Sequence, residues 1–75
     1  PGAQTDAREL TRLLNVYLEG LAPRDQLLFM RRYWFFDSCA EIARISGLSE
    51  KNVSVRLTRL RKKLRIFLEE NEVYL

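Results

Sequence analysis

Apolar side chains recur along the first part of this chain at the spacing of an α-helix. Between residues 6 and 21 they fall three or four positions apart, which gathers them on one face. Asp6 and Glu9 suit the positive end of a helix dipole, and Gly20 suits a helix end. The spacing therefore predicts an amphipathic helix that begins near Asp6 and closes at Gly20. The apolar face consists of Leu10, Leu13, Leu14, Tyr17, Leu18 and Leu21.

A second apolar stretch follows Pro23, whose fixed backbone angle and missing N–H favour the first turn of a helix. Its apolar groups lie almost all round the predicted helix, which is typical of a central core element. They are Leu27, Leu28, Phe29, Met30, Tyr33 and Trp34. Asp37 and Ser38 are expected to break this helix and to start the next. We expect the aromatic residues 33–36 to lie in the core or to cover the segment that follows.

Residues 38–65 predict a short helix, a glycine turn and a long helix. Ser38 and Glu41 have the spacing of a capping box, in which each side chain satisfies a backbone N–H of the other residue. Gly47 supplies a left-handed position that ends a helix, and Ser49 can cap the following helix from residue 50. A turn of about three or four residues between two such helices is typical of a helix-turn-helix.

The long helix predicted after Ser49 has two different faces. Its buried stripe is formed by Val53, Leu57, Leu60, Leu64, Phe67 and Leu68. At about 100° per residue, the opposite face holds Lys51, Val55, Thr58 and Lys62, flanked by Asn52, Ser54 and Arg59. Cations and short hydrogen-bonding side chains suit phosphates and base edges.

Positive charge is concentrated in this helix. Residues 56–65 hold six cations and no acid, and residues 44–65 hold eight of the thirteen Lys and Arg residues against one acid, Glu50. One alternative is a solvated helix whose charges only keep a small bundle soluble. The density of one sign after a helix-turn favours nucleic-acid binding instead.

The length of 75 residues fits one domain, and a 47% apolar composition is sufficient for a compact helical core. We predict an all-α fold, a small four-helix bundle that contains a helix-turn-helix with a long C-terminal recognition helix. The expected domain spans residues 6–70, with flexible tails at residues 1–5 and 71–75. Within the second tail, residues 73–75 are apolar and either fold back on the bundle, which we favour, or contact another protein.

The sequence offers little for catalysis. It contains no His, no Gly-rich phosphate loop and one cysteine, Cys39, so zinc, triad and disulfide chemistry have no basis. We expect a non-enzymatic protein without cofactor or metal, and a buried structural role for Cys39. With no apolar run of about 18 residues and no signal peptide, we expect a cytoplasmic protein.

Several motifs, taken together, resemble region four, the C-terminal domain, of bacterial RNA polymerase sigma factors, and most closely the extracytoplasmic-function group. The resemblance covers about residues 10–70. The motifs are residues 21–34 (LAPRDQLLFMRRYW), Ser38 with Glu41-Ile42-Ala43, Gly47-Leu48-Ser49-Glu50, Asn52-Val53 and residues 56–64 (RLTRLRKKL).

This resemblance implies a domain that recognises the minus-thirty-five promoter element in the major groove of DNA. It also implies docking on the flap of the polymerase beta subunit, against the outside of the two N-terminal helices, and an anti-sigma factor is a further candidate partner. We expect a monomer when the domain is isolated. The implied DNA-binding residues are Ser49, Glu50, Lys51, Asn52, Ser54, Val55, Thr58 and Arg59, with Arg56, Lys62 and Arg44 as phosphate contacts.

The chain also departs from the family pattern. Residues 35–37 replace a short Gly-containing link, Ser46 replaces a frequent Leu, and Ser54 and Val55 replace Lys and Ser. The minus-ten-reading domain of a sigma factor is not in this sequence, so we expect an excised domain or a sigma-like regulator.

Two other functions remain open at this point. A LuxR-type response-regulator domain shares the Glu-Ile-Ala and Gly-x-Ser motifs and would form a homodimer on a palindromic site. A protein-interaction module would use the apolar surface of the N-terminal helices and residues 73–75 to bind polymerase or an anti-sigma factor.

Overall fold

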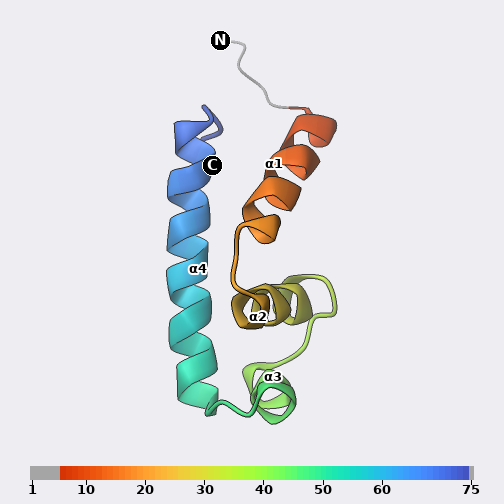
Figure 1. Cartoon of the computed structure of the whole chain (residues 1–75), viewed down its shortest axis with the longest axis vertical. Helices are drawn as coiled ribbons and strands as arrows, with labels where there is room; N and C mark the ends of the chain where they lie inside the picture. The colour runs from red at the N-terminus through yellow and green to blue at the C-terminus, as the bar shows by residue number, and fades with distance from the viewer. Residues whose placement is uncertain (1–5, 75) are drawn as a thin grey trace.

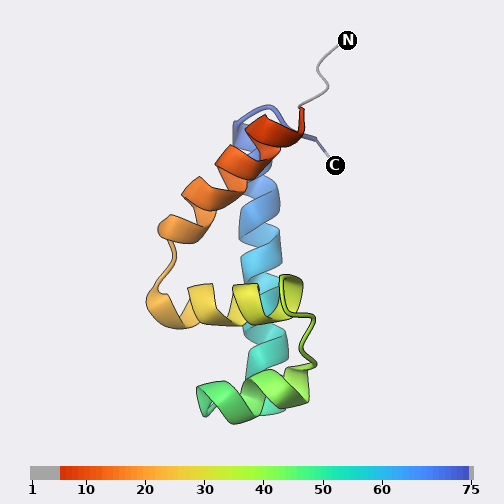
Figure 2. The same cartoon turned by 90° about the vertical axis from the view of Figure 1, so that its right-hand side faces the viewer.

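The computed structural model describes residues 6–74, which form four α-helices and no β-strand. The helices are α1 (Ala7–Glu19), α2 (Pro23–Tyr33), α3 (Cys39–Ser46) and α4 (Glu50–Glu70). The molecule is elongated, with extents of 44 × 19 × 18 Å. Helix α4 runs along the long axis, α2 and α3 cross it steeply, and α1 runs beside its C-terminal half (Figures 1 and 2). The predicted all-α fold is confirmed.

All other helices lie on one side of α4 (Figure 1). The opposite side is covered by no other helix of residues 6–74. None of the helices in this range is both long enough and apolar enough to cross a lipid bilayer.

The helix starts agree with the capping residues in the sequence. The Asp6 carboxylate accepts the N–H of Glu9 at 2.9 Å, and both hydrogen bonds of the Ser38 capping box are present. Gly47 ends α3 in the left-handed region at φ 77°, and the Ser49 hydroxyl accepts the N–H of Asn52 at 3.1 Å. Three residues, 47–49, therefore separate α3 from α4, as the helix-turn-helix prediction requires.

The core holds the helix-turn-helix together through residues from three helices. Its most buried cluster joins α2, α3 and α4 and consists of Leu28, Ile42, Val53 and Leu57. A second cluster joins α1, α2 and α4 through Tyr17, Leu18, Phe29 and Leu60. The Tyr17 hydroxyl donates to the Leu60 carbonyl at 2.7 Å inside the second cluster. The stripe predicted for the long helix is thus the face that packs. Cys39 packs against the first cluster but is only half-buried, so the prediction of a buried thiol is wrong.

Helix α2 ends at Tyr33, before the aromatic run is complete. Phe36 adopts a left-handed conformation at φ 57°, which L-residues other than Asn and Asp seldom occupy. The backbone N–H of Phe35 donates to the Met30 carbonyl at 3.3 Å, and that of Asp37 to the Arg31 carbonyl at 3.0 Å. These bonds turn the chain back before α3 begins.

Residues 33–36 were expected either in the core or as a cover of the helix-turn-helix, and the core alternative is wrong for residues 34–36. Trp34, Phe35 and Phe36 are 46%, 59% and 84% exposed. Arg31 holds the turn from the side, because its guanidinium lies 4.6 Å from the Phe35 ring centre and 2.7 Å from an Asp37 carboxylate oxygen. Tyr33 is partly buried and packs against both core clusters, and the exposed Trp34 ring lies 6.3 Å from that of buried Phe29.

The packed structure continues beyond the predicted boundary at residue 70. Val73 is 6% exposed, packs with Leu13 and Leu68, and donates its N–H to the Leu68 carbonyl at 2.8 Å. The folding-back hypothesis therefore holds for Val73, while Tyr74 is 72% exposed. The tail predicted at residues 1–5, and Leu75, lie outside the described residues.

Candidate nucleic-acid interface

The uncovered side of α4 carries most of the residues that the sequence proposes for DNA binding. The exposed members are Glu50, Lys51, Asn52, Ser54, Val55, Arg59 and Lys62. Lys51, Val55 and Lys62 lie opposite the Val53, Leu57 and Leu60 stripe that packs on the other helices. Asn52, Ser54 and Arg59 flank them, and Glu50 is exposed in the first turn of α4. The structure therefore brings these side chains together on one accessible face, which we call the outer face of α4.

The cations of this helix differ in their partners. Arg56 pairs with Asp25 of α2 at 3.3 Å, and Arg65 pairs with Glu69 at 3.6 Å. Within residues 6–74, Lys51, Arg59, Lys62 and Lys63 form no ion pair. Their charge is available to an external anion, and an uncompensated basic face attracts nucleic acid.

Arg56 is less free than the sequence suggested. Its side chain is 40% exposed, and one guanidinium nitrogen is engaged by the Asp25 carboxylate. Asp25 lies 31 positions earlier in the chain, so only the tertiary fold reveals this pair. The remaining N–H groups of Arg56 are still able to donate to a phosphate.

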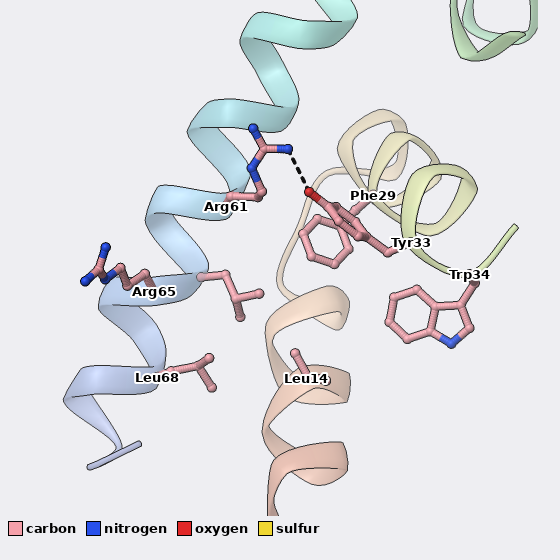
Figure 3. Close-up of a pocket in the computed structure, with 8 residues that line it drawn as sticks. Leu14, Phe29, Tyr33, Trp34, Arg61, Arg65 and Leu68 are labelled. Carbon is pink, nitrogen blue, oxygen red and sulfur yellow. Dashed lines mark hydrogen bonds between the residues drawn. The ribbon is translucent and has the colours of Figure 1, made fainter. Parts of the chain in front are cut away.

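Thr58 is half-buried and not fully on the surface. Its hydroxyl donates to the Ser54 carbonyl at 3.0 Å and accepts from Arg61 at 3.3 Å. Arg61 in turn donates to the Tyr33 hydroxyl at 2.8 Å (Figure 3). Thr58 is thus fixed in orientation by its neighbours, which leaves its methyl group and one lone pair for a ligand.

Ser49 and Arg44 lie outside the outer face. Ser49 is exposed, but its hydroxyl oxygen already accepts the N–H of Asn52 as the cap of α4. Arg44 is exposed in the last turn of α3, where a cation also stabilises the helix dipole. Hydrogen bonding of the Glu41 carboxylate with the backbone N–H of Ser38, and then with the Ser38 side chain, lowers the pKa of Glu41, and Arg44 and Arg31 contribute less.

Residues 11–64 match the model of a known protein family. The family model is described as sigma-70, region 4, and the matched range extends from α1 into the C-terminal half of α4 and contains the whole helix-turn-helix. The chain belongs to the sigma-70 region 4 family. Comparisons with the curated proteins and with the solved structures found no match.

Membership in the region 4 family has direct consequences. Region 4 is a DNA-binding helix-turn-helix domain of sigma factors in transcription and is not an enzyme family. It also decides between the two helix-turn-helix families considered from the sequence, against the LuxR type. The extracytoplasmic-function subgroup stays a prediction.

This region 4 domain also contains an apolar pocket that the sequence did not reveal. It has a volume of about 570 Å³ and lies where α1, the end of α2 and the C-terminal half of α4 meet (Figure 3). Helix α2 stops at Tyr33, and the next residue, Trp34, lines the pocket with its half-exposed ring. Its lining residues are Leu14, Phe29, Tyr33, Trp34, Arg61, Leu64, Arg65 and Leu68.

Proposed function

We propose that this domain binds the minus-thirty-five element of promoter DNA as the C-terminal domain of a sigma factor. The outer face of α4 would enter the major groove, which is about 12 Å wide and admits an α-helix. The observation that carries the proposal is the exposure of this face, with Lys51, Arg59 and Lys62 unpaired among the described residues.

The roles of the side chains follow from their positions on α4. Glu50, Lys51, Asn52, Ser54 and Val55 occupy the first two turns, the part of a recognition helix that contacts base edges. Further along, Thr58 and Arg59 would complete these base contacts. The phosphate contacts would be Arg56, Lys62 and, from α3, Arg44.

A salt titration tests the proposed face. Binding of a fluorescent promoter duplex should weaken with salt at a log–log slope of roughly −4 to −5 if about four to six phosphates are contacted. Lys51→Ala and Arg59→Ala should weaken binding. Arg8→Ala removes one positive charge, and Glu19→Ala one negative charge, from exposed positions of α1. Neither variant should change DNA binding, because α1 lies outside the proposed face. Equal binding by all four variants would rule out the outer face.

Selection from a random duplex library tests the type of site. A short asymmetric motif is expected for sigma-type recognition by one copy of the domain. A palindromic motif would show instead that two copies bind together, and it would contradict the proposed recognition of a minus-thirty-five element.

The apolar pocket favours polymerase docking as a second function of the same domain. Its lining is mostly aliphatic and aromatic, and the guanidinium of Arg61 places a positive charge at its edge, whereas that of Arg65 points away from it (Figure 3). These features suit an amphipathic helix that inserts apolar side chains and presents an acidic residue to Arg61. We propose that the flap of the polymerase beta subunit supplies this helix.

A binding assay with the isolated flap tests the docking proposal. Trp34→Ala removes a half-exposed ring from the pocket rim and should weaken flap binding. Phe36→Ala removes a more exposed ring that does not line the pocket and should leave flap binding unchanged. Neither variant should change DNA binding. Equal flap binding by Trp34→Ala and the wild type would exclude the pocket as the docking site.

A further inference from the structure

A second hollow lies on the side of α4 that faces the start of α2. It has a volume of about 250 Å³ and is lined by Asp25, Arg56, Arg59, Leu60 and Lys63. We call it the basic notch. Its three cations follow one another on α4 at spacings of three and four residues, so they lie on one face of the helix.

The charges in the basic notch do not balance. Three cations face one carboxylate, which leaves an excess of two positive charges. The carboxylate of Asp25 engages a single nitrogen of Arg56 at 3.3 Å, while Arg59 and Lys63 are exposed and form no ion pair within the described range. Two guanidinium groups and an ammonium around one hollow provide many donors for a tetrahedral anion.

The position of the basic notch relates it to the outer face of α4. Arg59 belongs to both, whereas Lys63 lies about 100° around the helix from Lys62. An α-helix with its side chains is about 10–12 Å across and nearly fills a major groove about 12 Å wide. Side chains on the flank of such a helix therefore face the sugar-phosphate backbone and not the bases.

We propose that the basic notch binds one phosphate of the DNA backbone through Arg56 and Lys63, while Arg59, which also lines the notch, reaches from its edge toward the bases. Asp25 is the internal counter-charge that holds Arg56 in place before DNA arrives. This inference rests on the proposed DNA-binding function and adds to it a ligand site that joins α2 to α4. Lys63 and Asp25 are its new residues, and their effect on binding is independent of base sequence.

The expected effects have opposite signs for the two new residues. Lys63→Ala removes one phosphate contact, so the log–log salt slope should become shallower by about 0.9, with equal loss on a selected duplex and on an unrelated one. Asp25→Asn removes a negative charge beside the bound phosphate, so binding at low salt should tighten about two- to fivefold.

Arg8→Ala is the matched control. Like Lys63, Arg8 is exposed and forms no ion pair within the described residues, but it lies on α1 and lines neither the basic notch nor the apolar pocket. Its salt slope should equal that of the wild type. Thermal unfolding followed by circular dichroism verifies that each variant is folded at the temperature of the titration.

The outcomes separate this proposal from the function on which it rests. If the wild type shows no salt-dependent binding to any duplex, the proposed DNA-binding function fails as well. If Lys51→Ala weakens binding while Lys63→Ala binds like Arg8→Ala, or if Asp25→Asn weakens binding, the notch proposal alone is wrong. Titration of the wild type with inorganic phosphate at constant ionic strength tests whether the notch binds free phosphate instead of DNA. If phosphate shifts the NMR signals of Lys63 while Lys63→Ala leaves the DNA salt slope unchanged, the notch is a free-anion site and the proposal is also overturned.

Discussion

Replacing Gly47 by Ala tests whether the turn of the helix-turn-helix depends on a left-handed glycine. Gly47 has φ 77°, and a Cβ added there would meet no atom within 4 Å. The effect of the substitution is therefore conformational and not steric. A left-handed L-residue costs about 1–2 kcal/mol. The smaller freedom of Ala in the unfolded chain offsets about 0.4–1 kcal/mol of this cost.

The net loss of stability for Gly47→Ala is then about 1 kcal/mol. With an unfolding entropy of about 2.1 cal/mol/K per residue, a chain of 75 residues has about 0.16 kcal/mol/K in total. The melting temperature should therefore fall by about 6 °C. Thermal unfolding followed by far-UV circular dichroism measures this difference directly.

Gly20→Ala is the matched control for this experiment. Gly20 caps α1 at φ −82°, a conformation open to any residue. A Cβ there would lie 3.5 Å from the Tyr17 carbonyl oxygen, an ordinary contact distance. Its melting temperature should equal or exceed that of the wild type. If Gly47→Ala unfolds no earlier than the wild type, or if both variants lose the same stability, the argument from backbone conformation is refuted.

Three further predictions concern stability. Tyr17→Phe removes the buried hydrogen bond to Leu60 and should cost about 1 kcal/mol in chemical denaturation. Burial, and then the charge of Asp25, raises the pKa of Tyr17, so the wild type but not Tyr17→Phe should lose additional stability as the pH rises above about 10. Hydrogen bonds at the cap lower the pKa of Glu41, so its carboxylate stabilises the fold above the ordinary glutamate pKa of about 4.3, and this stabilisation is lost as the pH falls below that value. The melting temperature of Glu41→Gln should therefore depend less on acid pH than that of the wild type. Val73→Ala should cost about 1–2 kcal/mol, whereas Tyr74→Ala at an exposed site should have almost no effect.

The local signals in the sequence were sufficient to predict the helices and their starts. Asp6, Ser38 and Ser49 cap the helices that they were expected to cap, because a capping hydrogen bond depends on residues only three positions apart. The buried face of α4 was predictable for a similar reason, since the apolar repeat has one period throughout the helix.

Features that depend on contacts between distant residues were not predictable. The Arg56–Asp25 pair and the basic notch arise where the start of α2 meets α4. The aromatic residues 34–36 were expected in the core or over the helix-turn-helix, because their apolar character was known and the left-handed turn at Phe36 was not. The apolar pocket, which Trp34 lines, joins residues of three helices and has no local signal in the sequence.

Helix α4 has a mechanical consequence that follows from its continuity. It contains no Gly or Pro over its 21 residues, the two commonest causes of a kink. The apolar pocket borders its C-terminal half, while most of the proposed base contacts lie in its first two turns. A stiff rod of this kind would hold a partner in the apolar pocket at a set distance and a set angle from a duplex on the outer face of α4.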